Sequence, residues 1–483
     1  MLRVHFAVRA LLIPVALLAA HVACPAADEP APVAPGKFIP TYAVAYGGSE
    51  GWLPAEQAAH FDLLDVGSSP SFATILQSEY GNTWQTLKHH NPHIVITIYQ
   101  NGPSLFDTDE FRQPGADWTW IKANHGIGSA DPWIAIGAQH GGYLQGTPYP
   151  NEMLMNIQNA NWRQWWVEQT WARSWGGDNP PGLGANAIFS DNTMLTMPWG
   201  GGWHTEGKPD EPDVPSCYYR AGEYDIGRFR PYERDLLALA IPWLNERGVK
   251  MVLNFAGMSD RPERWLELDA LNPAPFAAME EGAFASPWGR TPGSFSFSSE
   301  EEWRNLVDTM AKLRNVRALM NIHGPVSSDA PGIERMAGSD ASGNRAWDVL
   351  WYAMTSFLQG LDTERHNAYM NFTIWNYGKY FWFDEWDPKY LDLGHARGPY
   401  QMVPVGDAHV YLREFDDGWA AANPTAANAA KVAVPGGAQA RVLNHYTFKH
   451  PDDQPLVSTF DLPAHRGVIL LKPGRQIGNQ DNQ

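Results

Sequence analysis

Eight short apolar runs recur along the chain, and the segments between them carry apolar residues at helical spacing. The runs cover residues 39–46, 61–66, 94–99, 187–189, 250–253, 276–279, 318–322 and 369–374. The helical patterns cover residues 73–90, 161–175, 232–247, 262–271, 299–314 and 345–361. Strands that alternate with helices predict a parallel sheet, and the count of eight predicts an α/β fold, a (β/α)8 TIM barrel, over residues 37–400.

Most of these runs end in a polar or an acidic residue. Because every strand of a parallel barrel ends at the same face, these residues are expected to line one pocket. The strand ends carry Gly47-Gly48, Gly67-Ser68, Gln100-Asn101, Asp191-Asn192, Asn254, Glu280-Glu281, His323 and Trp375-Asn376.

Two strand ends carry candidate catalytic carboxylates. Asp191 closes the fourth run, where it either faces the pocket or caps the next loop. Glu280 and Glu281 follow the sixth run. Because side chains alternate along a strand, only one of the two glutamates should face the pocket, and we favour Glu280. Two carboxylates on either side of a sugar are the minimum equipment for glycoside hydrolysis, and their separation, which decides between retention and inversion, does not follow from the sequence.

Other polar and aromatic residues near the strand ends are candidates for binding sugar hydroxyls. They are Tyr46, Asp65, Tyr99, Asn101, Asn192, Asn254, His323 and Trp375. Asp65 could equally be a buried structural residue, and Asp62, at the start of its strand, is expected to be structural. Each of the others except Trp375 could instead satisfy backbone groups at the rim of the barrel.

The longest insertion is expected after the fourth strand, over residues 194–232. It carries three glycines between Trp199 and Trp203, which predicts two indoles that swing over the mouth of the barrel and bind substrate. The alternative is that these tryptophans only pack. The tryptophans of 161–175 fall at helical spacing, which predicts packing of a helix against the barrel.

The character of the chain changes from residue 401 onward. Short strand-like runs at 408–415, 419–423, 431–434, 441–444 and 467–472 are broken by Gly, Pro and Asp. They predict a small antiparallel, sandwich-like β-domain over 401–473, followed by a polar tail over 474–483.

The first 36 residues predict export. Residues 1–26 contain weakly basic and then apolar positions before small residues, the pattern of a secretory signal peptide, and 27–36 form a Pro-rich linker. We therefore expect a periplasmic or extracellular protein with no transmembrane segment. Lipid attachment at Cys24 is an alternative, although His21 stands where a lipoprotein signal has Leu. After cleavage Cys217 has no partner for a disulfide.

The net charge of the chain restricts the classes of molecule that it is expected to bind. The chain has 53 acidic and 35 basic residues, a formal charge of −18, which argues against nucleic acid and anionic membranes. Its 22 tryptophans suit stacking on sugar rings, although packing accounts for many of them. No motif with metal-ligand spacing occurs, so neither a metal nor a cofactor is predicted. The oligomeric state is left open.

Several short motifs resemble bacterial glycoside-hydrolase-like TIM-barrel families that end in a C-terminal β-domain. Phe189-Ser190-Asp191-Asn192 and Met279-Glu280 resemble their strand-four and strand-six elements. The passage into the β-domain is similar at Tyr390-Leu391-Asp392-Leu393-Gly394, at residues 411–419 and at Asn423-Pro424. The families have Asp-Gly before the strand-six acid, where this chain has Phe276-Ala277, which leaves the choice between the two glutamates open. The resemblance implies a reaction class and no particular substrate.

These patterns predict an exported glycoside hydrolase with a carbohydrate substrate and a two-carboxylate mechanism. One alternative is a carbohydrate-binding barrel without turnover. Another is a polysaccharide lyase, which needs a base beside a basic uronate site, whereas the strand ends are poor in Lys and Arg.

Overall fold

The computed structural model describes residues 37–46, 53–66, 83–107, 115–147, 149–171, 185–197, 202–216, 219–220, 223–224, 226–287, 295–325, 332–340, 342–374, 377 and 380–475. The predicted signal peptide and linker, Cys217 and most of the predicted polar tail lie outside these residues, so export stays a prediction. None of the described helices is long and apolar enough to cross a membrane.

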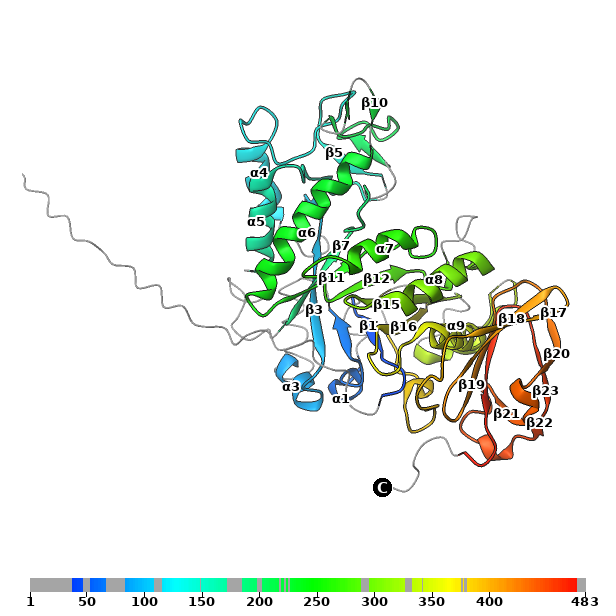
Figure 1. Ribbon diagram of the computed structural model, residues 1–483. Helices are drawn as coiled ribbons and strands as arrows, with labels where there is room; N and C mark the ends of the chain where they lie inside the picture. The colour runs from blue at the N-terminus through cyan, green and yellow to red at the C-terminus, as the bar shows by residue number, and fades with distance from the viewer. Residues whose placement is uncertain are drawn as a thin grey trace, which may run out of the picture.

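Eight parallel strands form the central barrel, as predicted (Figure 1). In sheet order they are β1 (Tyr42–Val44), β2 (Leu63–Asp65), β3 (Val95–Asn101), β7 (Ala187–Asp191), β11 (Lys250–Asn254), β12 (Ala277–Glu281), β15 (Arg317–Gly324) and β16 (Ala368–Ile374). A parallel bridge between Thr41 and Met370 joins the first strand to the last, and the Met370 N–H donates to Pro40 O at 2.9 Å. The TIM-barrel prediction is therefore confirmed.

The strands are buried on both faces, as in other parallel barrels. Alternate residues point inward, where Val44, Leu63, Phe189, Val252 and Met279 belong to one apolar cluster that fills the barrel. The intervening residues point outward into a larger cluster shared with the helices. This alternation decides which polar residue at each strand end reaches the interior.

Helices cover the outside of the barrel. They are α1 (Ala55–Ala58), α3 (Thr83–His90), α5 (Ala160–Trp171), α6 (Phe229–Asn245), α7 (Pro262–Asp269), α8 (Glu300–Lys312) and α9 (Ala346–Gly360). Helix α8 begins with a capping box, in which Ser299 Oγ accepts from the Glu302 N–H and Glu302 accepts from the Ser299 N–H. On α5, Trp162 and Trp166 are fully buried, which confirms the predicted packing role of these tryptophans.

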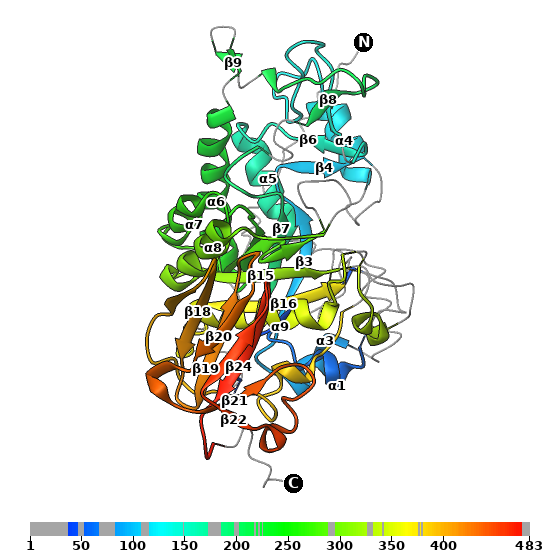
Figure 2. The ribbon, with the colours of Figure 1, turned by 90° about the vertical axis from the view of Figure 1, so that its right-hand side faces the viewer.

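A four-stranded antiparallel sheet stands at one end of the barrel (Figures 1 and 2). Its order is β4 (Ser104–Phe106), β6 (Glu152–Leu154), β5 (Leu144–Gly146) and β8 (Trp203–Thr205), with α4 (Gly115–His125) beside it. We call this sheet with α4 the insertion. Three of its strands come from the segment between β3 and α5, and only β8 comes from the segment after β7.

The prediction that the longest insertion follows the fourth strand is therefore wrong. The chain from β3 to α5 spans residues 102–159, and it holds most of the insertion. Its strands are three residues long, too short for alternation of polar and apolar residues to reveal them.

The antiparallel β-domain predicted at the C-terminal end is confirmed. One sheet contains β17 (Gln401–Val405), β18 (Ala408–Glu414), β19 (Gly418–Asn423), β24 (Arg466–Leu471), β21 (Ala440–Leu443) and β22 (Leu456–Val457) in that order. A pair formed by β20 (Ala429–Ala433) and β23 (Thr459–Leu462) covers one face of it, and an apolar cluster lies between the two layers.

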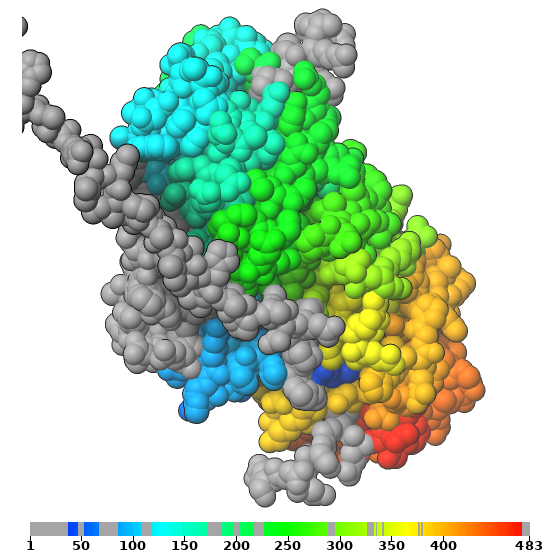
Figure 3. Space-filling model, turned by 60° about the vertical axis from the view of Figure 1, so that its left-hand side comes forward, coloured from blue at the N-terminus to red at the C-terminus, as the bar shows by residue number. Residues whose placement is uncertain are grey.

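The other face of this sheet packs on α9, which is buried along almost its whole length. The approach is close at Gly467, where an added Cβ would lie 1.8 Å from Thr355 Oγ1. Arg413 donates to the carbonyl oxygens of Leu358 and Leu361 at 2.8 and 2.6 Å, so β18 caps the C-terminal end of α9. Figure 3 shows that the insertion and the C-terminal domain lie at opposite ends of the molecule.

The remaining described elements are short. They are β9 (Tyr219–Arg220), β10 (Glu223–Tyr224), β13 (Ala285–Ser286), β14 (Ser296–Phe297), η6 (Ile226–Arg228), η7 (Gly332–Ala337), η8 (Asp384–Trp386), η9 (Pro435–Gly437) and η10 (Pro451–Asp453).

Candidate active site

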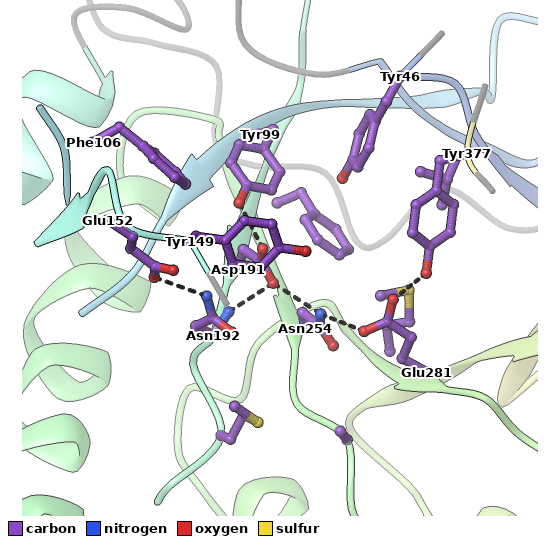
Figure 4. Close-up of a pocket in the computed structure, with 15 residues that line it drawn as sticks. Tyr46, Tyr99, Phe106, Tyr149, Glu152, Asp191, Asn192, Asn254, Glu281 and Tyr377 are labelled. Carbon is purple, nitrogen blue, oxygen red and sulfur yellow. Dashed lines mark hydrogen bonds between the residues drawn. The ribbon is translucent and has the colours of Figure 1, made fainter. Parts of the chain in front are cut away.

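A pocket of about 260 Å³ opens at the C-terminal ends of the barrel strands, beside the insertion (Figure 4). Its walls combine aromatic rings, carboxylates and amides. The described residues that line it are Val44, Tyr46, Tyr99, Phe106, Tyr149, Glu152, Phe189, Asp191, Asn192, Met194, Asn254, Ala256, Met279, Glu281 and Tyr377. Of the predicted site residues, six line this pocket: Tyr46, Tyr99, Asp191, Asn192, Asn254 and Glu281.

A single amide links the two carboxylates at the centre of the pocket. Asn254 Nδ2, at the end of β11, donates to Asp191 Oδ1 at 2.8 Å and to Glu281 Oε2 at 3.2 Å. These two oxygens are therefore at most about 6 Å apart, the sum of the two contacts. Three successive strands of the sheet, β7, β11 and β12, thus place acid, amide and acid in a row.

Glu281, and not Glu280, faces the pocket, so our preference for Glu280 is wrong. On β12, Ala277 and Met279 belong to the inner apolar cluster, and Glu281 continues their alternation. Glu280 points to the outer side, where its Oε2 accepts the Met258 N–H at 2.7 Å. Burial raises the pKa of Glu280 to about 8, against the lowering effect of its bonds to the backbone of Met258 and Ser259.

The surroundings of Glu281 favour its protonated form. Burial raises the pKa of Glu281 above its usual value, and the nearby charge of Asp191 adds to the effect. Hydrogen bonds from Tyr377 and Asn254 act in the opposite direction. The Tyr377 hydroxyl donates to Glu281 Oε1, and burial followed by the charge of Glu281 raises the pKa of Tyr377 well above 10, so this phenol stays a donor.

Asp191 accepts hydrogen bonds on both carboxylate oxygens. The Tyr99 hydroxyl donates to Oδ2 at 2.6 Å, while Asn254 Nδ2 and the Asn192 N–H each lie 2.8 Å from Oδ1. These three donors, two side chains and one backbone N–H, hold both carboxylate oxygens of Asp191 in place as acceptors. Asn192 follows Asp191 with a φ of 55°, which turns the chain away from the strand.

Three predicted site residues lie one layer behind the pocket. Asp65 accepts from the hydroxyls of Tyr46 and Thr97 at 2.5 and 2.7 Å. His323 Nε2 lies 3.3 Å from the Tyr377 hydroxyl, and so stands behind the partner of Glu281. Asp65 and His323, like Asn101, do not line the described pocket, but they contact side chains that do. Asp62 pairs with Lys37 at 2.8 Å and accepts the Thr41 N–H, as expected of a structural acid.

A third carboxylate, Glu152 on β6, lines the pocket and was not predicted. Its Oε1 accepts from Asn101 Nδ2 at 3.1 Å, from Asn192 Nδ2 at 3.2 Å and from the Ser104 hydroxyl. The insertion delivers it together with Phe106 and Tyr149, and no pattern of barrel strands marks these positions. Tyr377 was also missed, although it lies three residues beyond β16 and thus within reach of the strand-end rule.

The structure contradicts the predicted lid role of Trp203. This indole is fully buried in β8, inside the insertion, and belongs to the large apolar cluster. Trp199 and Trp375 lie outside the described residues, and their predicted roles stay predictions.

Within the described part of the chain, no group of three or more His, Cys, Asp or Glu side chains is placed to hold a metal ion. The polar groups of the pocket instead bond to one another.

No protein-family model and no curated protein sequence matches this chain. Among solved structures, it is similar to the type III pullulan hydrolase from Thermococcus kodakarensis, at 10% identity and a TM-score of 0.42, over 86% of this chain and 69% of that chain. It is similar to the isomaltulose synthase from Klebsiella sp. LX3 at 11% identity and a TM-score of 0.44, over 90% and 98% of the two chains. The cyclic α-maltosyl-(1→6)-maltose hydrolase from Arthrobacter globiformis is similar at 13% identity and a TM-score of 0.40, over 92% and 100%. At these values the similarity carries no argument about activity.

Proposed function

We propose that this chain is a retaining glycoside hydrolase in which Asp191 is the nucleophile and Glu281 the general acid and base. The observation that carries the proposal is the Asn254 bridge between these two carboxylates. The two hydrogens of an amide group point about 120° apart, so two oxygens bonded at these distances lie about 5 Å from each other. Retaining enzymes separate their carboxyl groups by about 5–5.5 Å, and inverting enzymes by about 6.5–9.5 Å to admit a water.

The raised pKa of Glu281 and the hydrogen bonds of Asp191 support this division of roles. Glu281, whose pKa burial raises, holds a proton that it can give to the leaving oxygen. Asp191, surrounded by donors, attacks the anomeric carbon and forms a glycosyl ester as the glycosidic bond breaks. Glu281, now a carboxylate, takes a proton from water, and that water releases the sugar from Asp191 with its original anomeric configuration.

Aromatic and amide groups around the pair suit a sugar ring. Tyr46, Tyr99, Tyr149 and Tyr377 line the pocket, and a ring can place its C–H faces on such surfaces while its hydroxyls reach polar groups. We keep the predicted export as part of the proposal, so the substrate would be a glycan met outside the cytoplasm.

The proposal is tested by trapping the ester. The protein is incubated with panels of α- and β-linked oligosaccharides, and the anomer first released is followed by NMR. A 2-deoxy-2-fluoro glycoside of the sugar that is cleaved should then add one glycosyl mass to the peptide that contains Asp191. Release of the opposite anomer, or a label on another residue, would refute the retaining mechanism. An unsaturated product would instead identify a lyase.

Glu281→Gln supplies the matching control. With a substrate whose leaving group needs no protonation, this variant should form the ester, and added azide should restore turnover by attacking it. Glu280→Gln, which changes the neighbouring residue, should not need azide.

A further inference from the structure

A second pocket, of about 400 Å³, lies between the barrel and the C-terminal domain. Its walls come from η7, from the first turn of α9, from the segment that contains η8 and from residues 445–450 of the C-terminal domain. Among the described residues, it shares no lining residue with the candidate active site. Its volume is in the range of small-molecule sites, so it has room for a ligand of its own.

Aromatic rings are held in fixed positions in the wall of this second pocket. The ring of His445 stacks on the indole of Trp347, with the ring centroids 3.7 Å apart and an angle of 13° between the planes. The buried Glu385 Oε1 lies 2.7 Å from His445 Nδ1 and accepts from Trp351 Nε1 at 3.1 Å, so this carboxylate fixes the imidazole. Tyr446 is 62% exposed, and its ring stands at 74° to that of His445. The rings thus form a corner that is partly open to solvent.

An ion pair lies in the same wall. Asp384 and Lys449 pair with each other, and each side chain is a little less than half exposed. A carboxylate only accepts hydrogen bonds and an ammonium group only donates them, whereas a hydroxyl does both. A hydroxyl can therefore bond to both members of the pair, while a charged ligand would have to compete with one of them for the other.

We propose that this pocket is a second, non-catalytic binding site for a neutral saccharide. Tyr446 supplies a stacking surface for the C–H face of a sugar ring, and Asp384 and Lys449 bind its hydroxyls. That the same glycan is cleaved in the active site rests on the proposed glycoside hydrolase function, whereas the binding itself does not. Two sites on one chain raise the local concentration of a long glycan at the active site.

The test measures binding of soluble polysaccharides in the Asp191→Asn protein, in which the proposed cleavage is blocked. The dissociation constants for α-glucan, β-glucan, mannan and xylan polymers are obtained from the retardation of the protein in native gels that contain them. At least one polymer should retard the protein, and Tyr446→Ala in this background should raise that dissociation constant at least about tenfold. Retardation by none of the polymers, or equal retardation of both proteins, would overturn the inference.

A second variant tests the ion pair, and a third serves as the control. Lys449→Met removes the ammonium donor but keeps an unbranched side chain, and should weaken binding about tenfold. Trp120→Ala removes an exposed ring from α4, in the insertion, and should leave the dissociation constant unchanged. An equal loss in Trp120→Ala would assign the binding to exposed rings in general and overturn the choice of pocket. Unchanged binding in Lys449→Met would refute the role of the ion pair.

The two proposals fail differently. Cleavage of a polysaccharide whose binding does not depend on Tyr446 would refute the second site and leave the hydrolase in place. Binding that depends on Tyr446, without cleavage of any glycan, would refute the hydrolase and leave the second site.

If both proposals hold, Tyr446→Ala in the protein with Asp191 intact should raise KM for the polysaccharide at least about threefold. The kcat/KM for a short oligosaccharide, which one site can hold alone, should stay unchanged. An equal effect on both substrates would mean that Tyr446 acts on the active site, contrary to the inference.

Discussion

Buried carboxylates inside and outside the barrel are held by different kinds of donor. Glu280, and Glu233 on α6, accept backbone N–H groups, from Met258 and Ser259 in one case and from the loop at Met194 in the other. Asp191 and Glu281 are held mainly by tyrosine hydroxyls and an asparagine amide. Backbone donors move only if a loop refolds, whereas side-chain donors can reorient when a substrate enters.

The comparison also shows that burial does not by itself identify a catalytic acid. Burial raises the pKa of Glu280, Glu281 and Glu233 alike. Only Glu281 combines a raised pKa with a second carboxylate within reach across a pocket. The geometry of the partner, rather than the size of the shift, separates the two neighbours on β12.

The largest effect on activity is expected when a carboxylate inside the barrel and one outside it are replaced one at a time. Asp191→Asn removes the nucleophile and should lower kcat by at least about 10³-fold with little change in melting temperature. Glu280→Gln, the matched control, should retain kcat within about threefold, because its carboxyl lies on the outer side of β12. The kcat values of the two variants are measured by steady-state kinetics on the same substrate. Loss of activity in Glu280→Gln alone would reverse the assignment.

A smaller effect is expected at the side-chain donor of Glu281. Tyr377→Phe removes a hydrogen bond that lowers the pKa of Glu281, so the pKa should rise and the alkaline limb of the kcat/KM profile should move to higher pH. Loss of one bond to a charged group should lower kcat by about tenfold. An unshifted limb would mean that another group supplies the proton. Tyr42→Phe, inside the barrel, is the matched control.

The smallest effect on activity, but a clear effect on stability, is expected from Glu280. Folding raises its pKa from 4.5 to about 8, so the folded protein binds more protons than the unfolded chain between these values. Stability should therefore fall as pH rises through this window, by on the order of a few kcal/mol for this group. Glu280→Gln has no proton to lose, so chemical denaturation should show a flatter pH dependence. Parallel curves for the two proteins would contradict the raised pKa.

The barrel could be predicted because its strands leave a strong pattern. Each is a short apolar run that ends near a polar residue, and all eight runs overlap the strands observed. The candidate carboxylates at β7 and β12 follow from the same pattern. The choice between Glu280 and Glu281 does not, because it depends on where the inward alternation of β12 begins, and Phe276 to Met279 are apolar on both faces.

The insertion could not be predicted for a different reason. Its strands are three residues long, and β8 pairs with β5 across more than fifty residues of chain. Such pairing leaves no local signal, so Glu152 and Tyr149 were missed. Trp203 was placed at the mouth because a tryptophan beside glycines resembles a loop, whereas its burial in β8 is a tertiary effect.

The sheet of the insertion joins two loops of the barrel into one structural unit, because both loops contribute strands to it. Strands β4, β5 and β6 leave the barrel after Asn101, and β8 leaves it after Asp191, yet all four belong to one sheet. An engineer who wished to graft another specificity onto this barrel would have to exchange both segments together. Replacing either segment alone would expose an unpaired strand edge. A new pocket on this scaffold therefore requires two loops that are matched to each other.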